Sequence, residues 1–200
     1  NLKNMTDAIA HRGPDGEGLW FERNVGIGHR RLAILDLSPA GHQPMVSADH
    51  RYVLSYNGEV YNYRELRAEL EAEGIWFRSN TDSEVVLYAI AKWGTDALSK
   101  FNGMFALAFW DRRAQTLLLA RDRYGIKPLY YSTTGNNFYF GSEQKAITVN
   151  SEFQRKLNKP ALLEYLTFQN IFTDQTLLQD IYILPAGYFA TLDCNKSKPS

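Results

Sequence analysis

At 200 residues the chain is long enough for one domain with a sizeable core, and its 44% hydrophobic content is typical of a globular protein. Lysine plus arginine number 22, and so do aspartate plus glutamate, so the zero net charge gives no electrostatic reason to expect binding to nucleic acid or to an anionic membrane. No apolar run is long enough to cross a bilayer, and no signal-peptide pattern is present. A single cysteine, Cys194, excludes an intramolecular disulfide framework and favours a reducing, cytoplasmic location.

The first quarter of the chain has the pattern of short strands. After ten residues that look like the end of a helix, the apolar runs at 18–22 and 25–37 predict two strands joined by a turn. The segment 38–45 is polar and rich in proline and glycine, which predicts a loop. A further strand is expected over 51–56.

Two helices follow, and both carry start signals. Asn62 with Glu65 resembles a capping arrangement, and the TDSE sequence at 81–84 matches a capping box more closely. Gly74 and Gly94 stand where C-cap glycines are expected.

The second half returns to strands. Four apolar runs separated by turn residues predict a strand meander, and two of them are apolar on both faces, which indicates a sheet covered on both sides. The runs are 104–110, 116–122, 129–133 and 138–142. We also expect helices near 143–147 and 160–169 and a last strand near 187–192. Together the elements predict a layered α+β architecture with antiparallel sheet pairs.

Several common chemistries find no support in the residue spacing. The four histidines and one cysteine show no zinc-ligand spacing. The glycines of HRGPDGEG at 11–18 do not follow a strand and match neither phosphate-loop pattern; a plain turn explains them equally well. A Gly-x-Ser-x-Gly nucleophile motif is absent from the sequence.

Three polar clusters remain as candidates: Arg30-Arg31, the Asn-Gly-Glu sequence at 57–59, and Asp82. Each has a plain alternative, since Arg31 can extend along a strand edge, Asn-Gly can form a turn, and Asp82 can favour a helix dipole. Taken together they suit an amino-acid ligand. A guanidinium would bind the α-carboxylate, a carboxylate the α-ammonium, and amide donors a carbonyl that becomes an oxyanion.

Six motifs in order make the sequence similar to a known family. HRGPDGEG, GHRRLAILDL with GHQPM, YNGEVYNY, TDSEV, FNGMFALAFWD and ARDRYGIKPLYY resemble the glutaminase domain of glutamine-dependent asparagine synthetases. These are class II glutamine amidotransferases of the N-terminal-nucleophile hydrolase group. The resemblance extends from about 11 to 189. It implies a four-layer αββα fold with two packed antiparallel sheets, and a domain spanning 1–192 followed by a linker at 193–200 toward a synthetase domain.

The resemblance also implies an activity and a set of residues. Glutamine would be hydrolysed to glutamate and ammonia, and the ammonia would pass to a synthetase domain that activates aspartate with ATP and magnesium. Arg31 would bind the glutamine α-carboxylate, Asn57 and Gly58 would form the oxyanion hole, and Glu59 and Asp82 would hold the α-ammonium group. The implied glutamine-binding residues are Arg31, Leu32, Ala33, Ile34, Leu35, Asn57, Gly58, Glu59 and Asp82. No cofactor is expected in this domain. Expected partners are L-glutamine and the synthetase domain, with homodimers common in the family.

The sequence departs from the family in one catalytic respect. The family's nucleophile is a cysteine at the mature N-terminus, whose α-amino group acts as the base, and this sequence has none there. Cys194 lies in the polar tail and does not replace it. Truncation explains the absence most simply, and the chain as written is then predicted to bind glutamine without turning it over. A degenerate, non-catalytic scaffold domain and the glutaminase of another amidating enzyme, such as a phosphosugar amidotransferase, remain as alternatives.

Overall fold

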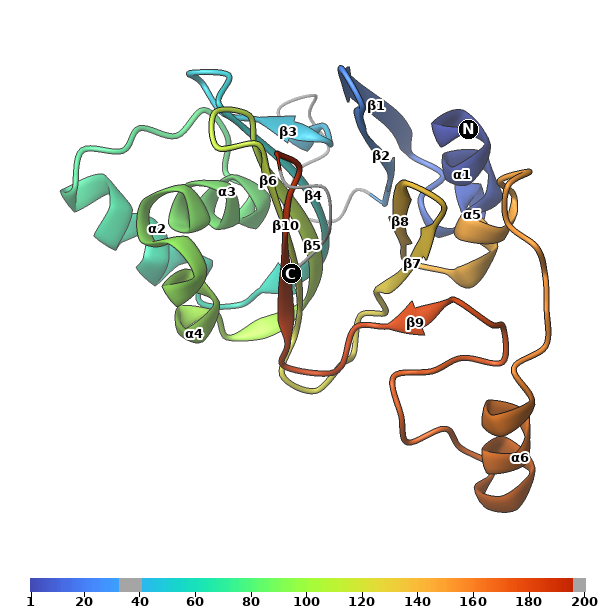
Figure 1. Ribbon diagram of the computed structural model, residues 1–200. Coiled ribbons are helices and arrows are strands. Elements are labelled where there is room, and N and C mark those ends of the chain that lie inside the picture. The colour runs from blue at the N-terminus through green and yellow to red at the C-terminus, as the bar shows by residue number, and fades with distance from the viewer. Residues whose placement is uncertain (33–40, 196–200) are drawn as a thin grey trace.

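The computed structural model describes residues 1–32 and 41–195 and has four layers, with helices outside and two β layers between them (Figure 1). One β layer is a five-stranded antiparallel sheet in the order β10-β6-β5-β4-β3. Its strands are β3 (Met45–Val46), β4 (Tyr52–Val60), β5 (Gly103–Asp111), β6 (Thr116–Arg121) and β10 (Phe189–Asp193). The middle of β5 is buried on both faces, as its uninterrupted apolar sequence predicts.

The second β layer consists of two antiparallel pieces, the pair β1-β2 and the three-stranded sheet β8-β7-β9. Its strands are β1 (Gly16–Glu22), β2 (Val25–Arg31), β7 (Tyr130–Thr134), β8 (Asn137–Gly141) and β9 (Tyr182–Ile183). The expectation of one meander over 104–142 was therefore wrong. The β5–β6 hairpin and the β7–β8 hairpin lie in different layers, because the 122–129 connection carries the chain from one layer to the other.

An apolar core joins the two β layers. Ile27 of β2 and Leu129 pack with the inward side chains of β5 and β6, Trp110 and Leu117 among them. A second core lies between the five-stranded sheet and the helices α2 (Tyr63–Ala72), α3 (Asp82–Trp93) and α4 (Ala97–Lys100). Because side chains alternate between the two faces of a strand, the apolar side chains of the central strands pack into two cores, one on each face of the sheet.

The remaining helices cover the other side of the molecule. They are α1 (Leu2–Ala8), α5 (Gln144–Thr148) and α6 (Lys159–Phe168), and single 3-10 turns lie at Ala10–Arg12 and Gly94–Asp96. Helices α1 and α5 contact each other and pack on β2 and β8, while α6 projects from the body (Figure 1). The four-layer α+β fold is confirmed. No helix among the described residues is long and apolar enough to span a membrane.

Helix starts follow the sequence signals in one case and depart from them in the other. Thr81 caps α3 as predicted, since its Oγ1 accepts a hydrogen bond from the Glu84 N–H at 3.2 Å. Asn62 is the N-cap residue of α2 as predicted, but its side chain makes no capping hydrogen bond. Its amide instead bridges to the 100–102 segment, donating to the Lys100 carbonyl and accepting from the Asn102 N–H. Strand β4 also runs further than predicted, to Val60.

The connection between the layers is organised by the buried carboxylate of Asp122. Its Oδ1 accepts from the N–H groups of Tyr124 and Ile126, both at 3.0 Å, and its Oδ2 accepts from those of Lys127 at 3.0 Å and Phe105 at 3.3 Å. Burial alone would raise the pKa of this carboxyl, but the four amide donors outweigh it and hold the pKa below its ordinary value.

Replacing this carboxylate tests its contribution to stability. We expect Asp122→Asn to lower the free energy of unfolding by about 1–3 kcal/mol, because the new NH₂ group faces N–H donors. With a depressed folded pKa, the stabilisation is present above the ordinary carboxyl pKa and is lost as the pH falls through the folded one. Urea unfolding at pH 7 and below pH 4 measures both effects. Asp49→Asn, at an exposed turn, is the control and should change stability less.

Candidate functional site

A cavity of about 680 Å³ lies between the two β layers and is lined by those predicted site residues that the structure describes. Strands β2 and β8 both border it, α1 contributes Leu2 and Met5, and β5 contributes Ala106 and Ala108. Within the described residues, β2 pairs only with β1 and β8 only with β7, so two edge strands border one cavity. Its volume falls within the usual range for small-molecule sites.

Arg31 ends β2 at the wall of this cavity. Its guanidinium lies against Gly41, where a Cβ atom would collide with it. A Cβ at this position would also lie 3.4 Å from the methyl carbon of Thr81. The end of β2, the start of the 41–46 segment and the start of α3 therefore meet at this guanidinium. A larger residue at position 41 would displace the tip of the arginine side chain from this place.

The Asn57-Gly58-Glu59 sequence lies inside β4 and lines the cavity. The hairpin turn that Asn-Gly commonly forms is absent, as the following helix predicts. These residues pair with β5 in continuous register, with Asn57 opposite Ala106. By strand alternation, the side chains of Asn57 and Glu59 point away from the helix face, toward the second β layer.

The backbone of Gly58 faces the edge of β4 that does not pair with β5. Two residues earlier, the Tyr56 N–H donates to Gln43 Oε1 at 2.6 Å; two residues later, the Val60 N–H donates to Asp82 Oδ2 at 3.1 Å. Strand alternation directs the N–H of Gly58 to the same side, between these two acceptors. A side chain at Gly58 would collide with the backbone of β5, so packing is one reason for a glycine here.

Asp82 reaches the cavity from the first turn of α3 and is only 5% exposed. Its Oδ2 accepts from the Tyr56 hydroxyl at 2.8 Å and from the Val60 N–H. Burial is the largest influence on this carboxyl and raises its pKa, and the nearby Glu59 carboxylate raises it further against the opposing hydrogen bonds. Two neighbouring carboxylates suit an ammonium ligand, because its positive charge would favour their ionised forms.

The structure adds residues that the sequence interpretation missed. His29 Nδ1 lies 3.1 Å from Ser55 Oγ, and both line the cavity. Each precedes a predicted residue by two positions on a strand, Arg31 in one case and Asn57 in the other. Since side chains two positions apart on a strand point to the same face, the sequence already indicated that His29 lies on the same face as Arg31, and Ser55 on the same face as Asn57.

His29 makes the site sensitive to acid. Burial, followed by the nearby His42 and Arg31 charges, lowers the pKa of His29 to about 4. The neutral ring stabilises the fold fully above about pH 6.5, and this stabilisation is lost as the pH falls toward 4, because the unfolded chain binds the proton first. We expect the loss to be no more than about 3 kcal/mol. In His29→Gln the free energy of unfolding, measured with urea, should vary less with pH between 7 and 4 than in the unaltered protein. The control His50→Asn, at an exposed position, should not show this change.

Some predicted residues lie outside this geometry. Ala33, Ile34 and Leu35 fall outside the described residues, and Leu32 lines the cavity with 56% of its surface exposed. Cys194 is exposed and does not border the cavity. Residues 1–32 and 41–195 contain no cluster of histidine, cysteine or carboxylate side chains able to hold a metal ion.

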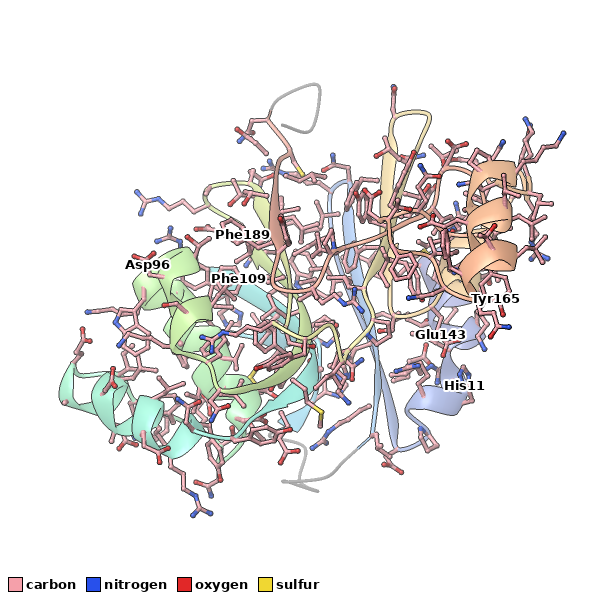
Figure 2. The ribbon with its side chains drawn as sticks, turned by 90° about the horizontal axis from the view of Figure 1, so that it is seen from below. His11, Asp96, Phe109, Glu143, Tyr165 and Phe189 are labelled. Atoms are coloured by element: carbon pink, nitrogen blue, oxygen red, sulfur yellow. The ribbon has the colours of Figure 1, made fainter. Side chains whose placement is uncertain are left out.

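The HRGPDG motif links the 3-10 turn at Ala10–Arg12 to the start of α5. His11 Nε2 and Arg12 Nη1 each lie 2.9 Å from Glu143 Oε1, and Lys145 binds the other oxygen at 3.0 Å; Figure 2 shows His11 and Glu143 side by side. Burial opposes ionisation of Glu143, but these hydrogen bonds lower its pKa to about 2. This ion cluster gives the motif an architectural role.

Comparison with known proteins identifies the domain. The family described as glutamine amidotransferase domain matches residues 1–200. The chain belongs to this glutamine amidotransferase family. The amidotransferase domain is 43% identical over 176 residues to asparagine synthetase 1 (glutamine-hydrolysing) of Bacillus subtilis strain 168, covering 88% of this chain and 28% of that protein. It is 41% identical over 165 residues to asparagine synthetase 3 of the same organism, covering 82% and 27%.

A solved structure agrees with the fold of the amidotransferase domain. The glutamine phosphoribosylpyrophosphate amidotransferase of B. subtilis, complexed with ADP and GMP, superposes with a TM-score of 0.55 at 25% identity. The similarity covers 66% of this chain and 31% of that one. The chain thus spans less than a third of the length of the B. subtilis relatives it matches.

Proposed function

We propose that this amidotransferase domain hydrolyses glutamine to glutamate and ammonia in the cavity between the β layers. The observation that carries the proposal is the convergence of a guanidinium, two carboxylates and amide donors on one cavity. Arg31 binds the α-carboxylate, while Glu59 and Asp82 hold the α-ammonium group. The Asn57 side chain and the Gly58 N–H stabilise the oxyanion that forms at the side-chain carbonyl.

The nucleophile enters on a strand that fills the gap between β2 and β8. Both strands are edges facing the cavity, and an extended segment between them would join the two pieces of the second β layer into one sheet. The thiol of a cysteine on that segment attacks the amide carbon, its proton passes by way of the cysteine α-amino group to the amide nitrogen, and the C–N bond breaks to release ammonia and leave a thioester. Water then hydrolyses the thioester to glutamate and regenerates the thiol.

The complete protein uses the ammonia in a second domain. The B. subtilis relatives are named glutamine-hydrolysing asparagine synthetases, which supports an ATP- and magnesium-dependent synthetase domain that converts aspartate to asparagine. A cytoplasmic location and a homodimer also belong to this proposal.

The full-length polypeptide tests the proposed glutaminase. We expect it to release glutamate from glutamine and to be inactivated by a glutamine-like electrophile, with the added mass on one cysteine in peptide mass spectrometry. The 200-residue chain alone should bind glutamine without releasing ammonia. A full-length protein that releases no glutamate and takes up no electrophile would instead support a non-catalytic scaffold domain.

A further inference from the structure

The pairing between β3 and β4 is extended by a side chain. Strand β3 lies beside β4 at the edge of the five-stranded sheet, with Met45 opposite Leu54 (Figure 1). In the same antiparallel register, Gln43 would lie opposite Tyr56. The Gln43 side chain binds there: its Oε1 accepts from the Tyr56 N–H at 2.6 Å, and its Nε2 donates to the Tyr56 carbonyl at 3.0 Å. One amide group thus replaces both hydrogen bonds that a neighbouring backbone would make.

The backbone of Gln43 lies against the other β layer. A Cβ atom on Gly18, in β1, would collide with the Gln43 carbonyl, so β1 contacts this backbone directly. Gly13 of the same HRGPDGEG motif lies equally close to the peptide that joins Arg30 to Arg31. The motif therefore supports two groups that border the cavity, the arginine at the end of β2 and the glutamine that binds β4.

The next position on this edge of β4 is Gly58, whose N–H is the proposed oxyanion donor. Gln43 binds the strand two residues before it, at Tyr56, and Asp82 binds the strand two residues after it, at Val60. The side chains that make these bonds are 7% and 5% exposed. The Gly58 N–H therefore lies between two fixed points, and its direction depends on both.

We propose that Gln43 is a positioning residue for the oxyanion hole, an inference that rests on the proposed function. Both polar atoms of its side chain bind the Tyr56 backbone, so it acts through β4 and not on glutamine itself. An oxyanion donor stabilises the transition state only when it is aimed at the place where the charge develops. A displacement of about 1 Å can lower a rate about 10²-fold, so a loosened strand at Gly58 would lower kcat without removing any contact to glutamine.

Gln43→Met in the full-length polypeptide tests this role. Methionine is similar in length, but it cannot donate to the Tyr56 carbonyl and is only a weak acceptor for the Tyr56 N–H. We expect kcat for glutamate release to fall about 20-fold and the KM for glutamine to change less than about three-fold. Gln115→Met is the matched control, because Gln115 also donates to a backbone carbonyl, that of Arg112, but in the β5–β6 turn outside the cavity. It should leave both constants unchanged.

Amide hydrogen exchange in the same proteins measures how firmly β4 is held, independently of activity. Peptides that cover 54–60 should exchange about ten-fold faster in Gln43→Met than in the unaltered protein, and Gln115→Met should show no such change. Circular dichroism checks that the variants are folded. Gln43→Asn is the milder second variant, since it keeps the amide but withdraws it by one methylene, and should lose about five-fold in kcat.

The results that would overturn the proposal are distinct from those that would overturn the glutaminase. A folded Gln43→Met or Gln43→Asn protein that keeps its kcat, or whose loss appears in KM instead, would refute the positioning role alone. Unchanged exchange over 54–60 would refute it as well, because Gln43 would then not hold β4. An unaltered full-length protein that releases no glutamate would refute the proposed glutaminase, and the role of Gln43 with it.

Discussion

Replacing Asn57 with alanine in the full-length protein should lower kcat for glutamine hydrolysis by about 10²- to 10³-fold, with little change in KM. The side chain points from β4 toward the second β layer, where the amide carbonyl of bound glutamine would lie beside the Gly58 N–H. A donor to an oxyanion acts mainly in the transition state, because the charge develops only there. Initial rates of glutamate release over a range of glutamine concentrations separate the two constants.

The control for this prediction is Asn62→Ala. Asn62 lies five residues further along, and its side chain only links the start of α2 to the 100–102 segment. It should lower stability by about 1 kcal/mol and leave kcat unchanged. An Asn57→Ala protein that lost affinity for glutamine but kept its kcat would assign Asn57 to ground-state binding and contradict the oxyanion role.

The sequence was most informative where periodicity and capping reflect local physics. Thr81 at the start of α3 and the doubly apolar β5 were predicted, because a hydroxyl cap and burial on both faces leave direct patterns. Asn62 begins α2 as predicted but makes no capping hydrogen bond, because its amide bonds instead to residues 38 and 40 positions further along the chain. A local pattern cannot show such competition from distant segments.

The grouping of strands into layers was not predictable from spacing. Four successive runs read as one meander, but the connection held by Asp122 carries the chain into the other β layer. In the same way, each site residue had a plain alternative when taken alone. Only the fold brings Arg31, from the end of β2, to Thr81 and Asp82 at the start of α3. The family resemblance implied this grouping, whereas His29 and Ser55 were found in the structure although the strand period of two places them on the same face.

The second large expected effect is on glutamine binding and concerns Arg31, which lies in the wall of the cavity. Arg31→Ala in the full-length protein should raise the KM for glutamine on the order of 10²- to 10³-fold, because the α-carboxylate would lose a charged, two-pronged donor. The kcat should change less, since the carboxylate is bound equally in the ground and transition states. Arg31→Lys should fall between the two proteins, because an ammonium keeps the charge without the paired geometry.

Arg30 offers a control on the neighbouring position. Its guanidinium contacts the Thr6 carbonyl at 3.1 Å, the Asp7 carboxylate and, at 3.2 Å, Glu17, so it holds α1 against the β1-β2 pair. Arg30→Lys should therefore alter thermal stability and leave the KM for glutamine near that of the unaltered protein. Equal increases in KM for Arg30→Lys and Arg31→Lys would show that the region responds to any loss of a guanidinium, and would remove the specific carboxylate contact assigned to Arg31.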